Sequence, residues 1–241
     1  MISVRTKLYF SMENLILQQF FVFTFSEQHD KMCSYLYFSF LRGQTMDSNF
    51  FALISRMRYI ARWGLMRNAL PENIQEHSHM VAVLAHALGV IRRDIFHQPC
   101  DVNALATAAL YHDASEILTG DLPTPIKYHN AEIMSAYHAV EDLAVQKLLG
   151  MLPPELRATY ADVLAEDKDG DIYPLVKAAD KLSAYIKCIE ERKAGNNEFL
   201  SAEAQTRAAL EASPLPEVQY FLEHFIPAFE RDLDELGAIG Q

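Results

Sequence analysis

The segment Ala109-Leu-Tyr-His112-Asp113-Ala-Ser-Glu116-Ile-Leu-Thr-Gly120-Asp121 places a histidine and an aspartate side by side in an otherwise apolar stretch. An unpaired carboxylate on the core-facing side of a helix is destabilising by several kcal/mol, so it normally takes up a proton, pairs or binds a cation. Neighbouring helical residues point about 100° apart, so His112 and Asp113 can contact one ion, while Glu116 follows one turn later. We therefore expect one helix, ending at Gly120, to supply two metal ligands and a spare carboxylate.

Two further ligands are expected from other helices that face the same core. His77 begins a helix in which apolar residues recur at spacings of three and four, at Val81, Leu84, Leu88 and Ile91. Asp180 lies among small residues that allow another helix to approach. Two imidazoles and two carboxylates would neutralise a divalent ion and leave positions open if it is six-coordinate, which favours catalysis. The predicted metal ligands are His77, His112, Asp113 and Asp180.

Several ordered motifs resemble those of bacterial HD-domain 5′-deoxynucleotidases, which are metal-dependent phosphohydrolases. In chain order they are Arg62-Trp63, Glu76-His77-Ser78, Tyr111-His112-Asp113-Ala-Ser-Glu116, Thr119-Gly-Asp121-Leu-Pro-Thr-Pro125, Ala179-Asp180 and Ala194-Gly-Asn-Asn-Glu198-Phe. The resemblance runs from about Asn49 to about Asp234. It implies an all-α HD-domain helical bundle and a homodimer. The helical periodicity of the chain agrees with the fold, but no stripe of residues by itself demonstrates the dimer.

The resemblance implies hydrolysis of deoxyribonucleoside 5′-monophosphates to the deoxyribonucleoside and phosphate. One divalent metal ion would lower the pKa of a bound water and polarise a phosphate oxygen, and Glu116 would orient or deprotonate that water. Nitrogen and oxygen ligands suit cobalt, manganese, copper, iron or zinc, and the sequence selects neither the metal nor the preferred base. Arg62 would grip the phosphate, and Trp63 would pack against the deoxyribose C2′.

Asp121 has two open roles, because it could protonate the leaving 5′ oxygen or position the phosphate and water. The predicted catalytic residues are Glu116, Asp121 and Arg62. The predicted substrate-binding residues are Arg62, Trp63, His77, Asp113, Asp121, Leu122, Pro123, Thr124 and Asp180.

Other interpretations of these residues stay open at this point. Another HD-domain phosphohydrolase could act on nucleoside di- or triphosphates or cyclic nucleotides, although a triphosphate would call for more arginine or lysine than the motifs contain. A non-catalytic metal-binding regulatory module is the alternative from another class, but such a module would need neither Glu116 nor Asp121. Taken singly, Asp180 could pair with a neighbouring lysine, and Trp63 could simply belong to the core.

Composition excludes several classes of partner. The chain has 241 residues and is 50% hydrophobic, which suffices for one domain with a sizeable core. Its formal net charge of −11 argues against a surface that coats nucleic acid or binds a membrane. The three cysteines lack metal-type spacing and indicate reduced thiols in a cytoplasmic protein.

Residues 1–45 differ from the remainder, because their apolar runs are rich in aromatic residues and interrupted by polar ones. No run reaches the roughly 18 to 20 residues of a spanning helix, and no small-residue cleavage site follows closely. We interpret them as an N-terminal extension or a mis-assigned start. Met46-Asp47-Ser48 carries a helix N-cap signal, so residues 46–241 are expected to form the HD domain.

Helices are expected almost throughout this domain. Asn73 should cap the His77 helix, which runs to about Phe96, and Asp101 or Asn103 should cap the His112 helix. Asp167-Lys-Asp-Gly170-Asp is expected to be a loop, since it lacks the full calcium-binding pattern. The other expected helices are Phe50–Ile60, Asn130–Leu149, one opened by Pro153-Pro154-Glu155, Tyr173–Lys193, Glu198–Ala212, and Glu217–Leu236 with a kink at Pro227.

Overall fold

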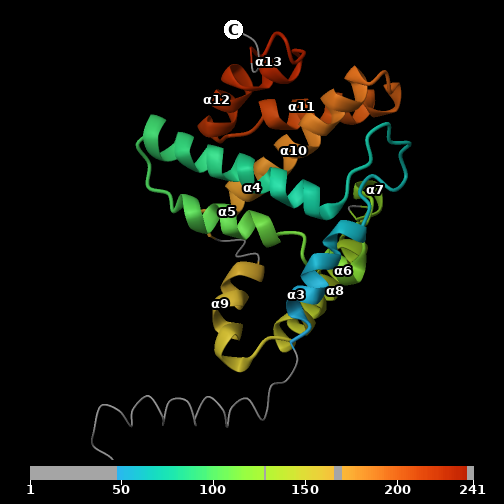
Figure 1. The fold of residues 1–241 in the computed structure, drawn as a ribbon, viewed down its shortest axis with the longest axis vertical. Coiled ribbons are helices and arrows are strands. Elements are labelled where there is room, and N and C mark those ends of the chain that lie inside the picture. The colour runs from blue at the N-terminus through green and yellow to red at the C-terminus, as the bar shows by residue number, and fades with distance from the viewer. Residues whose placement is uncertain (1–47, 128, 166–169, 238–241) are drawn as a thin grey trace, which may run out of the picture. The chain divides into compact units, whose positions relative to one another are not determined.

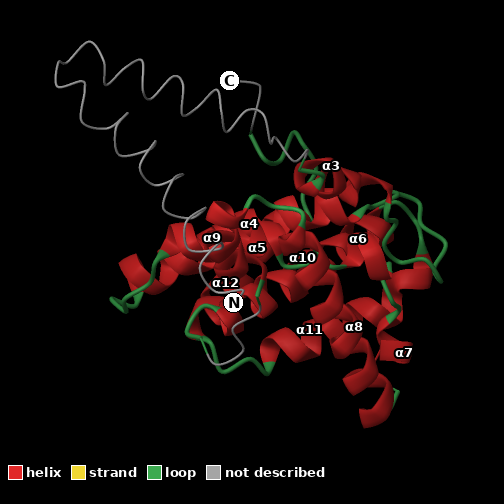
Figure 2. Ribbon diagram, turned by 90° about the horizontal axis from the view of Figure 1, so that it is seen from below, coloured by secondary structure: helices red, strands yellow, loops and turns green. Residues whose placement is uncertain are grey.

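The computed structural model describes residues 48–127, 129–165 and 170–237. Within these ranges the regular structure is helical, apart from one isolated bridge between Ala61 and Asn73 (Figure 2). The predicted all-α class is therefore confirmed. Residues 1–47, including the predicted extension and Met46-Asp47, lie outside the described part, as does most of the acidic loop at 167–171. No described helix is long and apolar enough to span a bilayer.

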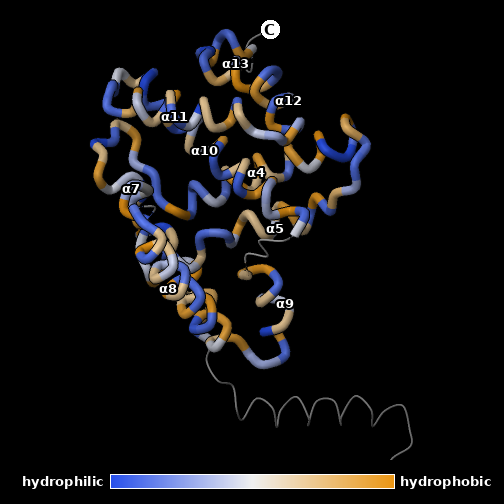
Figure 3. Tube along the Cα trace, turned by 180° about the vertical axis from the view of Figure 1, so that it is seen from behind, coloured by the Kyte–Doolittle hydropathy of each residue, from blue (hydrophilic) through white to orange (hydrophobic). Residues whose placement is uncertain are grey.

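Three helices form the centre of the fold and carry the predicted ligands: α4 (Ile74–Val90), α5 (Val102–Tyr111) and α10 (Tyr173–Lys193) (Figure 1). Helix α4 packs against both α5 and α10. All four residues of the predicted apolar stripe are buried, and His77 is fully buried beside them. Polar and apolar residues alternate in short runs along α4 and α10 (Figure 3), as expected for helices with one buried face.

The ends of these central helices follow local chemistry. The Asn73 side chain accepts the backbone N–H groups of Gln75 and Glu76, so the predicted cap of α4 is confirmed. Helix α4 continues into a wider π-helical turn, η2 (Ile91–Ile95), close to the predicted end. Asp101 caps α5 by accepting from the Ala104 backbone N–H. Helix α10 has the predicted bounds.

The predicted single helix through His112 to Gly120 is wrong. Helix α5 ends at Tyr111, a tight turn follows, and α6 (Glu116–Thr119) is a separate short helix. In the turn, the backbone N–H groups of Ala114 and Glu116 donate to the carbonyls three residues earlier. Such bonds wind the chain more tightly than an α-helix. Gly120 ends α6 as predicted, with φ of 74°.

Three helices surround a second, smaller core near the turn after α5. They are α3 (Phe50–Ile54), which continues as η1 (Ser55–Tyr59), α8 (Ala131–Gly150) and α9 (Pro154–Leu164). This core contains Phe50, Ala114, Leu148, Leu152 and Leu164. The short α7 (Thr124–Lys127) packs on α8.

Two expectations for this region need correction. No side chain among the described residues caps α3: its N-cap residue is Asn49, and the Ser48 hydroxyl instead donates to the Met151 carbonyl at 2.7 Å. Phe51 is expected on the apolar stripe of the predicted Phe50–Ile60 helix, but it is exposed.

The last helices pack on α10 and on each other. They are η3 (Asn197–Phe199), α11 (Leu200–Glu211), α12 (Pro216–His224) and α13 (Ile226–Phe229). The predicted helix to Leu236 is therefore too long, and its break falls at Phe225 rather than at Pro227. Proline lacks a backbone N–H and is tolerated in a first helical turn, and Pro227 stands in the first turn of α13.

Candidate active site

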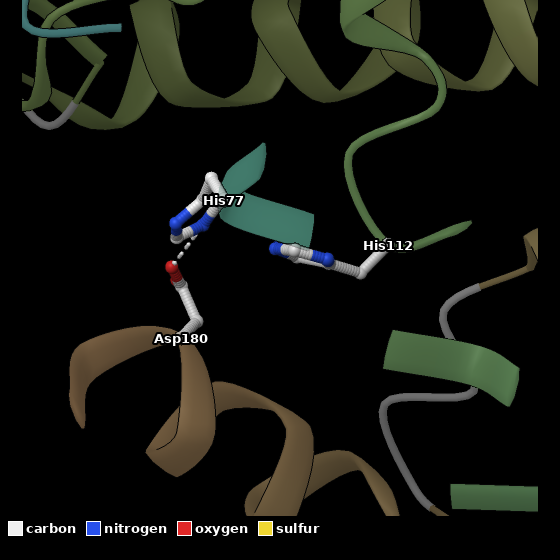
Figure 4. A group of neighbouring side chains, drawn as sticks. All are labelled: His77, His112 and Asp180. Carbon is white, nitrogen blue, oxygen red and sulfur yellow. Dashed lines mark ion pairs between the residues drawn. The ribbon is translucent and has the colours of Figure 1, made fainter. Parts of the chain in front are cut away.

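Three predicted ligands converge from two helices and from the turn after a third. His77 comes from α4, His112 from the residue after α5 and Asp180 from α10 (Figure 4). One ligand atom from each lies within 4.8 Å of the other two. The His77 Nε2 atom is 3.0 Å from Asp180 Oδ1, and the two imidazole ring centroids are 5.4 Å apart. These spacings bring the side chains close enough to share one ion.

The two imidazoles present their Nε2 atoms to this cluster. His112 Nδ1 lies 2.7 Å from the Ala109 carbonyl, which can only accept, so Nδ1 carries a proton and Nε2 is the nitrogen that can bind a metal ion. His77 Nδ1 lies 3.2 Å from the Ser183 hydroxyl. Both Nε2 atoms are buried without a hydrogen-bond partner among the described residues. Buried nitrogens of this kind, next to a carboxylate, fit a bound metal ion.

Asp113 lies beside this cluster. Its Oδ2 atom is 3.2 Å from His112 Nε2, 3.6 Å from His77 Nε2 and 3.3 Å from Arg62 Nη1. It does not belong to the set of mutually close ligand atoms, which contains the other three predicted ligands. Burial opposes ionisation, but the nearby His112, His77 and Arg62 lower the pKa of Asp113 below its ordinary value. Asp113 is thus ionised, and it contacts both the cluster and Arg62.

The ionisation of Asp180 follows the same logic. Partial burial opposes its negative charge, but contact with His77 and the charge of His112 lower the pKa of Asp180. Its side chain is 35% exposed, whereas that of His77 is fully buried. The cluster is therefore reached from solvent on the Asp180 side.

Glu116 begins α6 and is 8% exposed. Its Oε2 atom is buried and has no hydrogen-bond partner in the described part of the chain. Burial, followed by the charges of Asp113 and Asp121, raises the pKa of Glu116 to about 10, and Arg62 and Lys127 oppose this shift. A cation held by the neighbouring ligands would favour the ionised form and lower this pKa. Glu116 is therefore protonated at neutral pH unless such a cation lowers its pKa.

Arg62 and Trp63 lie between η1 and α4. Burial disfavours the Arg62 cation, but Asp113, Asp180 and Glu72 raise the pKa of Arg62, so it stays charged. Trp63 has φ of 58°, a left-handed conformation that is unusual for a bulky side chain. Its indole N–H donates to Glu72 Oε2 at 2.9 Å, and its ring packs edge-on against Phe199 at 5.2 Å. Strained backbone of this kind is common at binding sites.

The segment after α6 carries the remaining predicted residues. Asp121, Leu122 and Pro123 are half-buried, and Thr124 begins α7. Burial is the main cause that raises the pKa of Asp121, whereas Arg62 and a hydrogen bond from the Trp63 backbone lower it. Asp121 therefore lies near the Arg62–Trp63 segment.

Sequence reasoning missed two residues that contact the site. Ser183 follows Asp180 by three residues on α10, and this spacing could have indicated that both face His77. Glu72 contacts Trp63 and Arg62 from an irregular segment, where no periodicity signals its position.

Comparison with known proteins identifies the family. The sequence profile described as 5′-deoxynucleotidase YfbR-like matches residues 49–229. The chain belongs to the YfbR-like 5′-deoxynucleotidase family. The 5′-deoxynucleotidases YfbR of Shigella boydii and Escherichia coli are each 50% identical to it over 192 residues, which cover 79% of this chain and 96% of theirs.

Solved structures support the fold of this YfbR-like chain. An HD-domain phosphohydrolase from Listeria innocua superposes with a TM-score of 0.68 and 25% identity, over 77% of this chain and 90% of the other. A protein from Pyrococcus horikoshii, 21% identical, superposes with a TM-score of 0.58 over 76% and 98% of the two chains. The predicted HD-domain helical fold and phosphohydrolase class are thus confirmed.

Proposed function

We propose that the protein hydrolyses deoxyribonucleoside 5′-monophosphates to the deoxyribonucleoside and phosphate, and that it requires one divalent metal ion. The observation that carries this proposal is the convergence of buried, unpartnered imidazole nitrogens on a carboxylate, beside the buried Glu116. Membership of the YfbR-like family supports the reaction and the substrate class.

The metal would be held by His77, His112 and Asp180, with Asp113 as the adjoining fourth ligand. A divalent cation there supplies positive charge for a phosphate oxygen and makes a water molecule more acidic. The ligand set suits cobalt, manganese, copper, iron or zinc.

Side chains around the cluster have distinct roles in this proposal. Glu116 accepts a proton from the attacking water, because a cation on the neighbouring ligands would offset the effect of burial and keep its carboxylate ionised. Arg62 binds the phosphate with its guanidinium fork. Asp121 is the proton donor to the leaving 5′ oxygen, a role that its raised pKa supports. Trp63 packs against the deoxyribose at C2′, so that a ribose hydroxyl would clash with it.

The remaining substrate contacts are assigned to Leu122, Pro123 and Thr124, which follow Asp121 directly. The proposal also includes a cytoplasmic homodimer that binds neither nucleic acid nor membranes. Cys100 and Cys188, the free thiols of the described residues, support a reducing location, and the net charge of −11 supports the absence of nucleic-acid binding. The dimer rests on the resemblance to HD-domain 5′-deoxynucleotidases.

The test is phosphate release from deoxy- and ribonucleoside mono-, di- and triphosphates, with chelator-treated protein and with each candidate metal added back. We expect deoxyribonucleoside monophosphates to be the best substrates and chelation to abolish turnover. Preferential hydrolysis of triphosphates, or full activity after chelation, would contradict the proposal.

A further inference from the structure

One oxygen of the Glu72 carboxylate contacts both Trp63 and Arg62, the residues assigned to binding sugar and phosphate. Glu72 Oε2 accepts the Trp63 indole N–H at 2.9 Å and lies 3.4 Å from Arg62 Nε. The other oxygen, Oε1, lies 3.8 Å from Nδ1 of the metal-ligand candidate His77. The Glu72 side chain is only 15% exposed, so these contacts are shielded from solvent.

Electrostatics alone does not explain an acid at this position. Arg62 already pairs with Asp113, and a second carboxylate beside it weakens attraction for an anionic phosphate. A residue that only kept Arg62 charged would be redundant, since arginine stays protonated in proteins. The feature that Glu72 uniquely provides is an acceptor for the indole N–H, among the contacts of the described residues.

Trp63 needs such an acceptor because its backbone does not fix the ring. The left-handed φ of 58° is strained, and the Trp63 carbonyl is held by the Met66 backbone N–H at 2.8 Å. Among the described residues, the ring has one aromatic neighbour, Phe199, at its edge. A half-turn about the bond to the indole would move the N–H away from Glu72. The hydrogen bond therefore selects one ring orientation.

We propose that Glu72 is a positioning residue for sugar selection, which orients the Trp63 ring and ties it to the phosphate-binding Arg62. This inference rests on the proposed function, in which Trp63 packs against the deoxyribose. Loss of the Arg62 contact should lower kcat/KM for deoxy- and ribonucleotides by the same factor. Loss of the Trp63 contact should change the ratio between the two values. The ratio of kcat/KM for dAMP to that for AMP is thus the specific readout.

The first experiment compares Glu72→Ala with Glu72→Gln. We expect the deoxy-to-ribo ratio to fall roughly tenfold in E72A, a factor within reach of one hydrogen bond to a charged group. The ratio should return towards the wild-type value in E72Q, because the amide oxygen can still accept the indole N–H. Glu76→Ala is the matched control, since Glu76 is an exposed acid in the first turn of α4, and its ratio should not change.

Trp63→Phe removes the donor of the same hydrogen bond. This variant tests the proposal if E72A does not fold. W63F should lower the ratio, and adding E72A to W63F should lower it no further, because both changes remove one interaction. If E72A lowers the deoxy-to-ribo ratio in W63F by the same factor as in the wild type, the two changes act independently and the proposal is overturned.

Fluorescence provides a readout without metal or substrate, because Trp63 is the sole tryptophan. In metal-free protein, E72A should show emission at longer wavelength and stronger acrylamide quenching than the wild type, and E72Q should not. If the wild type discriminates the two sugars and folded E72A keeps the same ratio, the role of Glu72 is overturned while the proposed function stands. A wild type that releases no phosphate from dAMP or AMP would overturn the proposed function, and this inference with it.

Discussion

At the scale of single residues, Glu116 is expected to transfer a proton without binding the metal. It lies outside the cluster of mutually close ligand atoms, and one of its oxygens has no hydrogen-bond partner among the described residues. We expect Glu116→Gln to retain the metal and to lower kcat by about a hundred- to ten-thousand-fold, the usual effect of losing a general base. Metal content by elemental analysis and kcat are the measurements. A parallel fall of both would make Glu116 a ligand.

Asp113 should behave differently, because it contacts both imidazoles and Arg62. We expect Asp113→Ala to lose metal and activity together, since its removal leaves the Arg62 charge without this partner and takes away the carboxylate beside His112 Nε2. Asp142→Ala, on the exposed side of α8, is the control. Substantial turnover in metal-depleted D113A protein would refute a metal-dependent mechanism.

These residues also show what a sequence can reveal about a site. His77 was predictable because it is a polar residue within a buried helical stripe, where burial without a partner is unfavourable, whereas Asp180 was selected by the family motif and taken alone could pair with a neighbouring lysine. Glu72 was not predictable, because an acid in an irregular segment is indistinguishable from a solvated one. Its position depends on a fold in which the segment after η1 returns to α4, as the bridge between Ala61 and Asn73 indicates.

At the scale of elements, periodicity predicted the long helices but not the break after α5. The segment from Val102 to Thr119 keeps an apolar pattern throughout, while its backbone changes to three-residue hydrogen bonds at His112. Strong caps, such as Asn73 and Asn130, made the start of α4 and α8 predictable. Short turns depend on tertiary packing, which no local signal records.

The C-terminal half of α10 holds the segment that follows Trp63. Glu191, which is fully buried, accepts the backbone N–H groups of Ala69 and Leu70 at 2.8 and 3.0 Å. It also accepts from Lys187 and from the Asn196 amide. Burial opposes its charge, but these four donors lower the pKa of Glu191 from 4.5 to about 2. Glu191 is thus ionised in the folded protein at neutral pH.

A depressed pKa in the folded state predicts a definite pH dependence. The stabilisation by Glu191 is complete above its unfolded pKa near 4.5 and is lost as pH falls from there through about 2. We expect Glu191→Gln to be less stable than the wild type at neutral pH, and the difference in free energy of unfolding to shrink over this window. Urea unfolding at several pH values measures it. A constant difference would show that the charge of Glu191 is irrelevant.

At the scale of the whole molecule, the described residues from Ser48 onward contain every predicted site residue. We therefore expect deletion of residues 1–45 to leave folding and catalysis nearly unchanged. The measurements are thermal melting and kcat/KM of the shortened chain beside the full one. A melting temperature lowered by more than about ten degrees exceeds what a loss of 1 kcal/mol explains for a domain this size, and would refute the expectation.

The three convergent ligands lie far apart along the chain, at positions 77, 112 and 180. An unfolded chain cannot present them together, so a metal ion that binds them acts as a reversible cross-link between α4, α10 and the end of α5. Ligand binding to the native state alone stabilises it by about 2.7 kcal/mol at a hundred times the dissociation constant. The apparent melting temperature should therefore rise with free metal concentration in wild-type protein and should not rise in His77→Ala. Cells starved of the metal would then contain less of the folded protein as well as less activity, because the unfolded fraction is open to proteolysis.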